Sequence, residues 1–340
     1  MVTLTRTLGS TFRRPGARML VCGNGTVVRG LSGGCPEADM IARAHEVIGS
    51  GHARVVRYDR DSGLDALIEL GCGGQLEALI EPLNGEADLR FAYAIEQCLL
   101  SRKSGFAATA FAIDGVALGP RPRRLIWGGE LLLDEFGDPK LTRAVVERQS
   151  ADAGKSKRAY ITTIESAQGA VDVLLESLLP SYAAILVGVS AVSFALARVA
   201  RQLGWEVTVV DHRDDRTMSI PSDISANVIT AQPADVLRRL TVDERTVTVV
   251  MTHNLERDID YLRALLPAPF AYIGAIGSRQ RAQKLLDACG TASSRLRVPA
   301  GLDIGAETPE EIALAIAAEI IAVCNDRQGG ILSGRSHSIH

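Results

Sequence analysis

Aromatic residues are scarce in this sequence, and no long run of charges of one sign occurs. Aromatics make up 4% of the 340 residues, and the formal net charge is −3. So few rings argue against an RNA-binding sheet that stacks bases on aromatic side chains. The absence of a long basic run argues against general binding to nucleic acid or to a membrane surface. The sequence therefore predicts neither nucleic acid nor a membrane as a partner.

Paired cysteines and long hydrophobic runs are also missing. The sequence has six cysteines, but none forms a Cys-x-x-Cys pair, and their spacing fits no zinc site. The first ten residues lack the apolar core of a signal peptide. The apolar runs 185–197 and 312–323 are too short or too interrupted to span a bilayer. We therefore expect a cytoplasmic protein with reduced thiols.

Regular alternation of strand and helix patterns begins near residue 183. Such alternation predicts a mostly parallel sheet that is covered on both faces by helices. The last helix has a clear predicted start, because Thr308 can cap it, Pro309 suits its first position and Glu311 completes a capping box. The second half of the chain therefore has the sequence pattern of a Rossmann-like α/β domain.

The length and the globular composition, with 46% hydrophobic and 23% charged residues, favour two domains. We expect an N-terminal α/β domain over 1–176 with a less regular middle region over 102–170. The Rossmann-like domain is expected over 177–327, and a disordered tail over 328–340.

Two cysteines in the first half are flanked by glycines. Ser32-Gly33-Gly34-Cys35 comes directly before a helix predicted over 37–48, with Pro36 in its first turn. The helix dipole then favours a thiolate, so we hypothesise a lowered pKa for Cys35. The alternative is a turn with a small buried cysteine. The second such stretch is Gly71-Cys72-Gly73-Gly74, just before a predicted strand.

The first strand–helix connection of the second half resembles a dinucleotide-binding turn with two substitutions. Gly188, Ser190 and Ser193 occupy the three glycine positions of Gly-x-Gly-x-x-Gly, and Asp211 follows at the end of the next strand. Serine adds bulk where the backbone approaches a pyrophosphate and where the helix packs closely. Either NAD(P) binding or a Rossmann-type scaffold with an altered pocket is consistent with this pattern.

Two later loops of the second half also follow predicted strands. His253 comes after the strand over 246–251, and Gly277, Ser278 and Arg279 begin a helix. Ligands of open α/β sheets bind beyond the carboxyl ends of the strands. The free N–H groups, hydroxyl and guanidinium of residues 277–279 suit an anion. His253 is either a packed histidine or a ligand-binding one.

Several ordered motifs extend over nearly the whole chain. In the first half these motifs are Gly9-Ser10, Arg14-Pro15-Gly16-Ala17-Arg18-Met19-Leu20, Ser32-Gly33-Gly34-Cys35-Pro36-Glu37 and Gly71-Cys72-Gly73-Gly74. In the second half they are Val209-Val210-Asp211-His212-Arg213, Met251-Thr252-His253, the stretch 272–279 and the long run 300–313. In this set and order, the chain resembles the XdhC/CoxF-type accessory proteins of molybdenum hydroxylases such as xanthine dehydrogenase.

This resemblance implies an N-terminal XdhC/CoxI-type domain, a C-terminal Rossmann-like domain and a homodimer. It also implies a chaperone, rather than a turnover enzyme with catalytic residues of its own. Such a chaperone binds the molybdenum cofactor, a molybdopterin whose mono- or dinucleotide form stays open. It supports sulfuration of the cofactor by a cysteine desulfurase and delivers it to an apo molybdenum hydroxylase of the xanthine, aldehyde or CO dehydrogenase type. The cofactor nucleotidyltransferase is a further implied partner.

Residue roles follow from the resemblance. Cys35 and Cys72 are soft donors suited to molybdenum or to a transferable sulfur, and Gly33, Gly34, Gly73 and Gly74 expose the backbone beside them. Arg14 and Arg18 supply positive charge, and the cofactor-binding set is completed by Asp211, His253, Gly277, Ser278 and Arg279. Many family members have Gly-Ala-Gly-His-Val-Gly over 188–193, whereas this chain has Ala191 at the histidine position. Two other classes stay open: an NAD(P)-dependent oxidoreductase that uses the C-terminal domain, and a thiol-based sulfur carrier.

Overall fold

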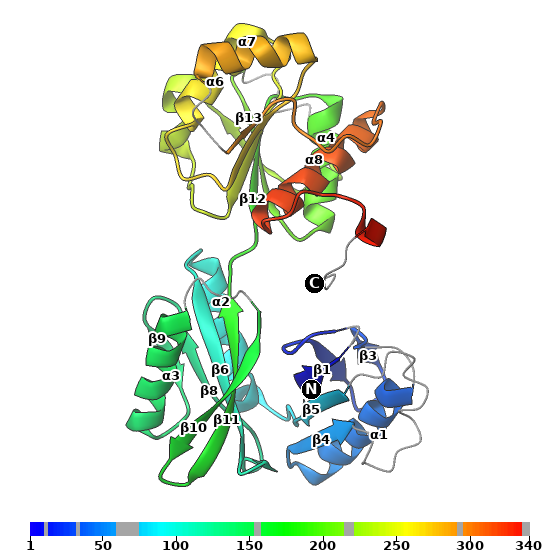
Figure 1. Cartoon of the computed structure of the whole chain (residues 1–340), viewed down its shortest axis with the longest axis vertical. Coiled ribbons are helices and arrows are strands. Elements are labelled where there is room, and N and C mark those ends of the chain that lie inside the picture. The colour runs from blue at the N-terminus through cyan, green and yellow to red at the C-terminus, as the bar shows by residue number, and fades with distance from the viewer. Residues whose placement is uncertain are drawn as a thin grey trace. The chain divides into compact units, whose positions relative to one another are not determined.

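The chain folds into two compact units, Met1–Pro180 and Ser181–His340, which are described separately. The structure, a computed structural model, describes residues 1–9, 13–31, 35–58, 75–152, 158–213, 221–290 and 295–334 (Figure 1). Within these ranges no helix is long and apolar enough to cross a membrane.

The first unit begins with a small antiparallel sheet covered by one helix. Its strands are β1 (Val2–Leu8), β2 (Arg18–Val21), β3 (Val27–Val28), β4 (Arg54–Tyr58) and β5 (Gln75–Ile80), in the spatial order β3-β2-β1-β5-β4. Helix α1 (Cys35–Ser50) confirms the helix predicted over 37–48. Its apolar residues Met40, Ala44 and Val47 recur at helical spacing and pack in one cluster with Val2 and Leu4 of β1.

A second antiparallel sheet occupies most of the region 102–170, where the expectation of a less regular structure is wrong. The elements are α2 (Glu86–Leu100), β6 (Gly105–Ile113), β7 (Val116–Ala117), β8 (Arg123–Trp127), β9 (Leu131–Asp134), α3 (Pro139–Asp152), β10 (Tyr160–Ser166) and β11 (Gly169–Leu178). The sheet order is β10-β11-β6-β8-β9, and β7 pairs with β6. The central strand β6 is alanine-rich and buried along nearly all its length. It therefore lacks the alternation that marks a half-exposed strand.

The two sheets of the first unit are joined by ion pairs and an apolar cluster. Arg6 of β1 contacts Asp172 of β11 at 2.9 Å, and Arg18 of β2 binds Glu176 of β11. A cluster that draws on both sheets contains Ala53, Leu79, Phe111, Ala112 and Leu174. Arg6 and Arg18 therefore help to hold the two sheets of the first unit together.

The second unit is built on a six-stranded parallel sheet. Its elements are β12 (Ala183–Val187), α4 (Ala191–Gln202), β13 (Glu206–Asp211), β14 (Asn227–Thr230), the 3-10 helix η2 (Pro233–Arg239), β15 (Thr246–Val250), α6 (Leu255–Leu265), β16 (Tyr272–Ala275), α7 (Arg279–Cys289), β17 (Leu296–Arg297), α8 (Pro309–Cys324) and the 3-10 helix η3 (Leu332–Gly334). The spatial order β14-β13-β12-β15-β16-β17 is 3-2-1-4-5-6 in chain order, as in Rossmann folds. The predicted fold class is thus confirmed. Helix η3 lies within the tail that is expected to be disordered, and 335–340 lies outside the described residues.

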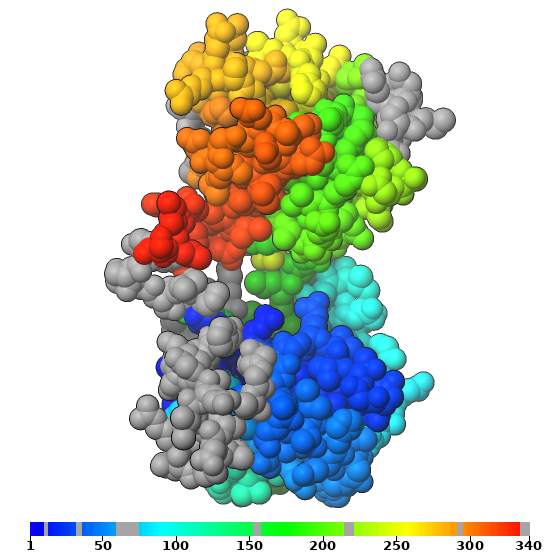
Figure 2. Space-filling model, turned by 90° about the vertical axis from the view of Figure 1, so that its right-hand side faces the viewer, coloured from blue at the N-terminus to red at the C-terminus, as the bar shows by residue number. Residues whose placement is uncertain are grey.

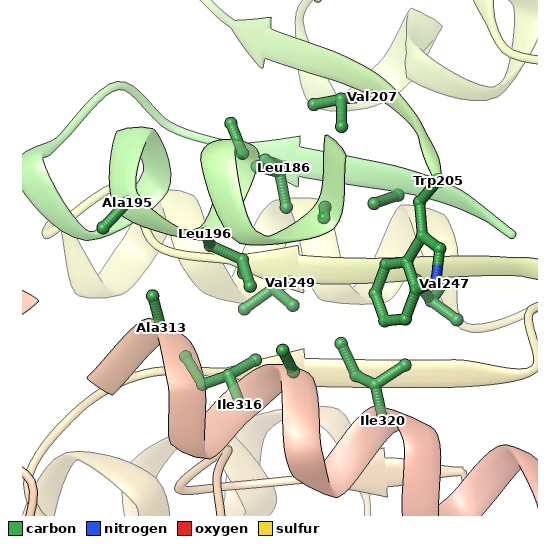
Figure 3. Close-up of a cluster of buried hydrophobic side chains, with 14 of the residues drawn as sticks. Leu186, Ala195, Leu196, Trp205, Val207, Val247, Val249, Ala313, Ile316 and Ile320 are labelled. Atoms are coloured by element: carbon green, nitrogen blue, oxygen red, sulfur yellow. The ribbon is translucent and has the colours of Figure 1, made fainter. Parts of the chain in front are cut away.

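Helices α4 and α8 lie side by side, in green and orange-red in Figure 2. Both contribute to one apolar cluster with the strands of this sheet. Figure 3 shows Leu196 of α4 and Ile316 and Ile320 of α8 directed toward Leu186 and Val249 of the sheet. The predicted start of α8 is confirmed: Thr308 and Glu311 form a reciprocal capping box, with Pro309 at the first position. Helices α6 and α7 contribute to a separate apolar cluster with Val187 and Val210. The sheet is therefore covered on both faces.

Candidate functional site

The carboxyl ends of β1 and β4 and the amino end of β5 lie side by side at one edge of the first sheet. Strand pairing places Leu8, at the end of β1, opposite Gln75, and Leu76 opposite Tyr58, at the end of β4. Gln75 is also the residue that follows Gly71-Cys72-Gly73-Gly74 in the sequence. The first sheet therefore brings the chain entering and leaving 59–74 to the same edge.

Helix α1 is tied to this edge by a buried tyrosine. The hydroxyl of Tyr58 donates a hydrogen bond to Asp39 Oδ2 at 2.8 Å, and Arg43 Nε also donates to that oxygen, at 2.6 Å. Burial, together with the hydrogen bond to Asp39, raises the pKa of Tyr58 above its ordinary value. Asp39 lies about one helical turn after Cys35, the first residue of α1. The bond therefore holds the amino end of α1 against the end of β4.

The cysteine segments themselves are only partly described. Cys35 begins α1, close to the helix N-terminus as predicted, and Pro36 lies in the first turn. The side chain of Cys35 lies outside the described part of the structure. The residues Gly33, Gly34, Cys72, Gly73 and Gly74 lie outside it as well. The thiolate character of Cys35 stays a prediction.

Of the two arginines expected to supply positive charge, Arg18 is bound within the unit. Its Nη1 donates to Glu176 Oε1 at 2.9 Å and to the Gly16 carbonyl at 3.2 Å, and its Nη2 donates to Glu176 Oε2. This two-point pair compensates the charge of Arg18 and holds β2 against β11. Arg14 is half-buried and forms no ion pair within the described ranges.

In the second unit, Gly188 lies where the strand order reverses, between β12 and β15. It has φ +105°, and a Cβ at this position would lie 2.7 Å from the carbonyl oxygen of Met251. Only glycine fits such a close backbone approach at positive φ. The loop after β15 therefore requires glycine at position 188, which is the first glycine of the predicted turn.

Substituting alanine at Gly188 is expected to destabilise the second unit by about 1–3 kcal/mol, because the side chain meets backbone atoms and φ is strained. Gly204 supplies a matched control, since it has φ +78° but no atom within 4 Å of an added Cβ. Gly204→Ala is expected to cost less than Gly188→Ala. Urea denaturation of both variants measures the difference, and equal costs would contradict the close approach at Gly188.

The serines that replace the other two glycines cap helix α4. Ser190 Oγ accepts from Ser193 N at 3.2 Å, and Ser193 Oγ accepts from Ser190 N at 2.8 Å. Ser193 is fully buried. A pyrophosphate at a Rossmann turn binds to free N–H groups at this helix end. Two such groups are therefore already occupied by the chain's own side chains.

Asp211 lies at the end of β13, as predicted, but it is 3% exposed. Its Oδ1 accepts from Arg213 N at 2.9 Å, and its Oδ2 accepts from Val189 N at 3.3 Å. The ring of His212 approaches Oδ1 at 3.4 Å. Asp211 thus joins the end of β13 to the turn after β12 and uses much of its acceptor capacity within the protein.

The loops after β15 and β16 are linked by a buried carboxylate that the sequence pattern does not single out. Asp258 accepts from Thr252 N at 3.0 Å and from Arg281 Nη2 at 2.6 Å. It is 1% exposed. His253, the residue after Thr252, is exposed and has φ +61°. The sequence signal for Asp258 is that of an ordinary first-turn acid of a helix, so its partner Arg281 is visible only in the fold.

The predicted anion-binding residues lie at the start of α7. Ser278 caps the helix by accepting from Arg281 N at 3.3 Å, and Arg279 is exposed in the first turn. Gly277 has φ +154°. Strands β15 and β16 are parallel neighbours, so His253 and residues 277–279 follow adjacent strand ends. Across the described ranges, no group of three or more His, Cys, Asp or Glu is arranged to hold a metal ion.

The strand order and the glycine at the reversal point define the second unit as a Rossmann-type domain. Residues 184–320 match the XdhC Rossmann domain, and residues 1–59 match the XdhC and CoxI family. Together the two matches cover more than half of the chain. Both units of the chain therefore match models of the XdhC family.

Relatives of known name match over almost the whole chain. A protein of Bacillus subtilis (strain 168), named as a probable subunit of xanthine dehydrogenase, is 27% identical over 94% of this chain and 92% of its own. The molybdenum cofactor insertion chaperone PaoD of Escherichia coli (strain K12) is 24% identical over 95% of this chain and 82% of its own. A crystal structure described as a xanthine dehydrogenase from Bacillus halodurans is 25% identical, with a TM-score of 0.77, over 98% of this chain and 93% of that chain.

Proposed function

We propose that this protein is an accessory chaperone that binds the molybdenum cofactor and delivers it to an apo molybdenum hydroxylase. The observation that carries the proposal is the similarity to PaoD, a molybdenum cofactor insertion chaperone, over 95% of this chain. That similarity includes the cysteine-bearing first unit as well as the Rossmann-type second unit. A Rossmann domain by itself would not distinguish a chaperone from an oxidoreductase.

The two units supply different chemistry in this proposal. Cys35 and Cys72 offer soft sulfur donors to molybdenum or to a transferable sulfur, with a cysteine desulfurase as the sulfur source. The loops after β15 and β16 offer His253, Ser278 and Arg279 to the phosphate or nucleotide part of the cofactor. The proposal includes a homodimer and the cofactor nucleotidyltransferase as a further partner.

An NAD(P)-dependent oxidoreductase is the second candidate. The 3-2-1-4-5-6 strand order and the position of Asp211 favour it. Against it, Ser190 and Ser193 occupy each other's backbone N–H groups, and Asp211 binds the backbone of Val189 and Arg213. Both features leave fewer backbone N–H groups and carboxylate oxygens at the turn to bind a dinucleotide.

Co-expression with an active cofactor pathway tests the two candidates. The purified protein is oxidised and its supernatant is examined for the fluorescent pterin, while calorimetry measures NADH binding. We expect pterin in the preparation and no NADH binding, because the turn after β12 is capped by its own serines. Absence of pterin together with measurable NADH binding would overturn the chaperone proposal in favour of the oxidoreductase.

A further inference from the structure

Helix α8 is apolar on nearly all its sides, although it lies at the surface of the second unit. Between Glu311 and Asn325 its only charged residue is Glu319. The Glu319 carboxylate accepts from the Tyr272 hydroxyl and from Gly301 N, so its charge is held within the unit. A helix with one solvated face normally carries polar residues along that face. None of the roles proposed above uses this helix.

Most sides of α8 are covered by the second unit itself. The side that packs with α4 and the sheet includes Ala313, Ile316 and Ile320 (Figure 3). On a second side, the buried Ala315 accepts a hydrogen bond from Leu302 N at 3.2 Å. The buried Ala322 accepts from Arg327 N at 2.8 Å, just beyond the helix. These contacts leave one side of α8 to the solvent.

The open side carries Leu314, Ala318 and Ile321, which we call the α8 stripe. Their spacing of four and three residues puts them on one face of the helix. Leu314 is 55% exposed and Ile321 is 38% exposed, with Ala318 half-buried between them. The face of α8 that meets water is therefore apolar along two turns.

Apolar residues outside α8 extend this surface. Ile304, Ile331 and Leu332 are all exposed. They follow segments that lie against each other, since a Cβ at Gly329 would be 2.8 Å from Leu302 Cδ2. Figure 2 shows α8 and the chain after it, in orange to red, on one face of the molecule. Exposed apolar surfaces of this kind mark sites of interaction with a protein or a membrane.

The residues around the stripe favour a protein over a membrane. A helix that lies on a membrane surface carries Lys and Arg beside its apolar face. Helix α8 contains neither, and its first turn holds Glu310 and Glu311. The α8 stripe is therefore a candidate surface for another protein chain.

The two ends of α8 differ in charge. At the amino end, Glu307 and Glu310 are exposed. At the carboxyl end, Arg327 and Asp326 are exposed, and Arg201 of α4 donates to the Trp205 carbonyl at 3.3 Å. Figure 3 shows Trp205 beside the last turns of α8. The basic residues thus lie at the carboxyl end only.

This pattern is complementary to itself. Glu310 lies eight residues before Ala318, and Arg327 lies nine residues after it. Within the described ranges neither Glu310 nor Arg327 forms an ion pair. A twofold axis near Ala318 sets two α8 helices antiparallel, so that the Glu310 end of each copy meets the Arg327 end of the other. Parallel helices would instead place acid against acid.

We propose that two copies of this chain associate through the α8 stripe, with their α8 helices antiparallel and crossing at Ala318. Leu314 of each copy then packs near Ile321 of the other, and the small Ala318 lets the helices approach closely. Stable interfaces bury about 1,200–2,000 Å² in total, so the flanking apolar residues around Ile304 and Leu332 take part as well. The inference rests on the proposed function only in giving the proposed homodimer an interface.

Sedimentation velocity of the purified full chain tests this interface. We expect the wild type to be dimeric at about 10 µM, and Leu314→Glu to raise the dimer dissociation constant at least about 100-fold, because an unpaired carboxylate is then buried. Leu100→Glu is the matched control, since Leu100 is an exposed leucine at the end of α2 in the first unit. We expect it to dimerise as the wild type does, and circular dichroism checks that both variants are folded.

Charge reversal tests the antiparallel arrangement. Glu310→Arg and Arg327→Glu are each expected to weaken the dimer about three- to tenfold, because each places like charges together twice in a symmetric interface. The double variant with both reversals restores opposite charges, so we expect its dissociation constant to return to within about twofold of the wild type. A double variant weaker than either single variant would overturn the antiparallel arrangement.

Three results would overturn the interface itself. The first is a wild type that stays monomeric up to about 100 µM, with or without cross-links from α8 to the first unit of the same chain. The second is a dimer that is equally strong in Leu314→Glu and Leu100→Glu. The third is an unchanged dimer in Leu314→Glu that no longer binds the apo hydroxylase, which would assign the stripe to that partner.

Pterin content after co-expression separates this interface from the proposed function. If the wild type carries pterin but Leu314→Glu is as dimeric as the wild type, the interface alone fails. If the wild type dimerises through Leu314 but carries no pterin, the chaperone proposal fails and the interface stands.

Discussion

Replacing Cys35 or Cys72 by serine is expected to reduce cofactor retention and maturation of the target enzyme by at least about tenfold. Serine keeps the size of cysteine but is a hard, neutral hydroxyl, whereas molybdenum and transferable sulfur require a soft thiolate. The position of Cys35 at the start of α1 adds the favourable field of a helix N-terminus. Pterin content after co-expression and activity of the matured hydroxylase measure the effect.

Cys22→Ser is the control for this experiment. Cys22 is a half-buried free cysteine of the same unit and is not preceded by glycine, whereas glycines precede both Cys35 and Cys72. We expect it to retain cofactor as the wild type does. If Cys35→Ser and Cys72→Ser both retain cofactor and mature the enzyme normally, neither thiol handles molybdenum or sulfur.

Arg124→Met is expected to destabilise the first unit by about 3–5 kcal/mol, because it leaves the carboxylate of Glu81 buried without its partner. The side chains of Arg124 and Glu81 are 5% and 1% exposed, and Arg124 Nη2 donates to Glu81 Oε1. The Arg124 guanidinium also lies 3.9 Å from the centre of the Phe91 ring of α2. Urea denaturation at neutral pH measures the loss.

The double variant Arg124→Met with Glu81→Leu separates a lost pair from an uncompensated charge. It is expected to recover most of the stability, since replacing both members of a buried pair by apolar residues is often neutral. Arg54→Met removes an exposed pair with Glu46 and is expected to cost less than about 1 kcal/mol. A loss in Arg124→Met as small as that in Arg54→Met would show that the buried pair does not stabilise the unit.

Much of the second unit could be predicted from local sequence. The strands of a parallel sheet covered on both faces are short apolar runs, and the last helix has a clear start signal in Thr308-Pro309. Because α4 joins β12 to its parallel neighbour β13, and β14 and η2 precede β15, the order of these strands constrains the fold strongly. Asp211, His253 and Ser278 accordingly lie at strand or helix ends as expected.

The first unit was harder to predict because its contacts join distant parts of the chain. Strand β6 pairs with β11 across a long separation in sequence, and its alanine-rich, fully buried pattern carries no period of two. The same distance hides the partner of Arg18, which the sequence suggests as a free positive charge and which binds Glu176. In the second unit, the pairing of Asp258 with Arg281 was missed for the same reason.

By itself, the sequence determined the Rossmann-like class of the second unit, the start of α1 at a glycine-flanked cysteine and the motifs of the XdhC and CoxI family. These are local properties, set by spacing, caps and turn residues. Only the tertiary structure decided which charges are compensated and which converge. The antiparallel register of β1, β5 and β4 aligns Arg6, Glu77 and Arg57, three residues that no local pattern connects. Register is a property of paired strands, so this row of charges exists only in the folded chain.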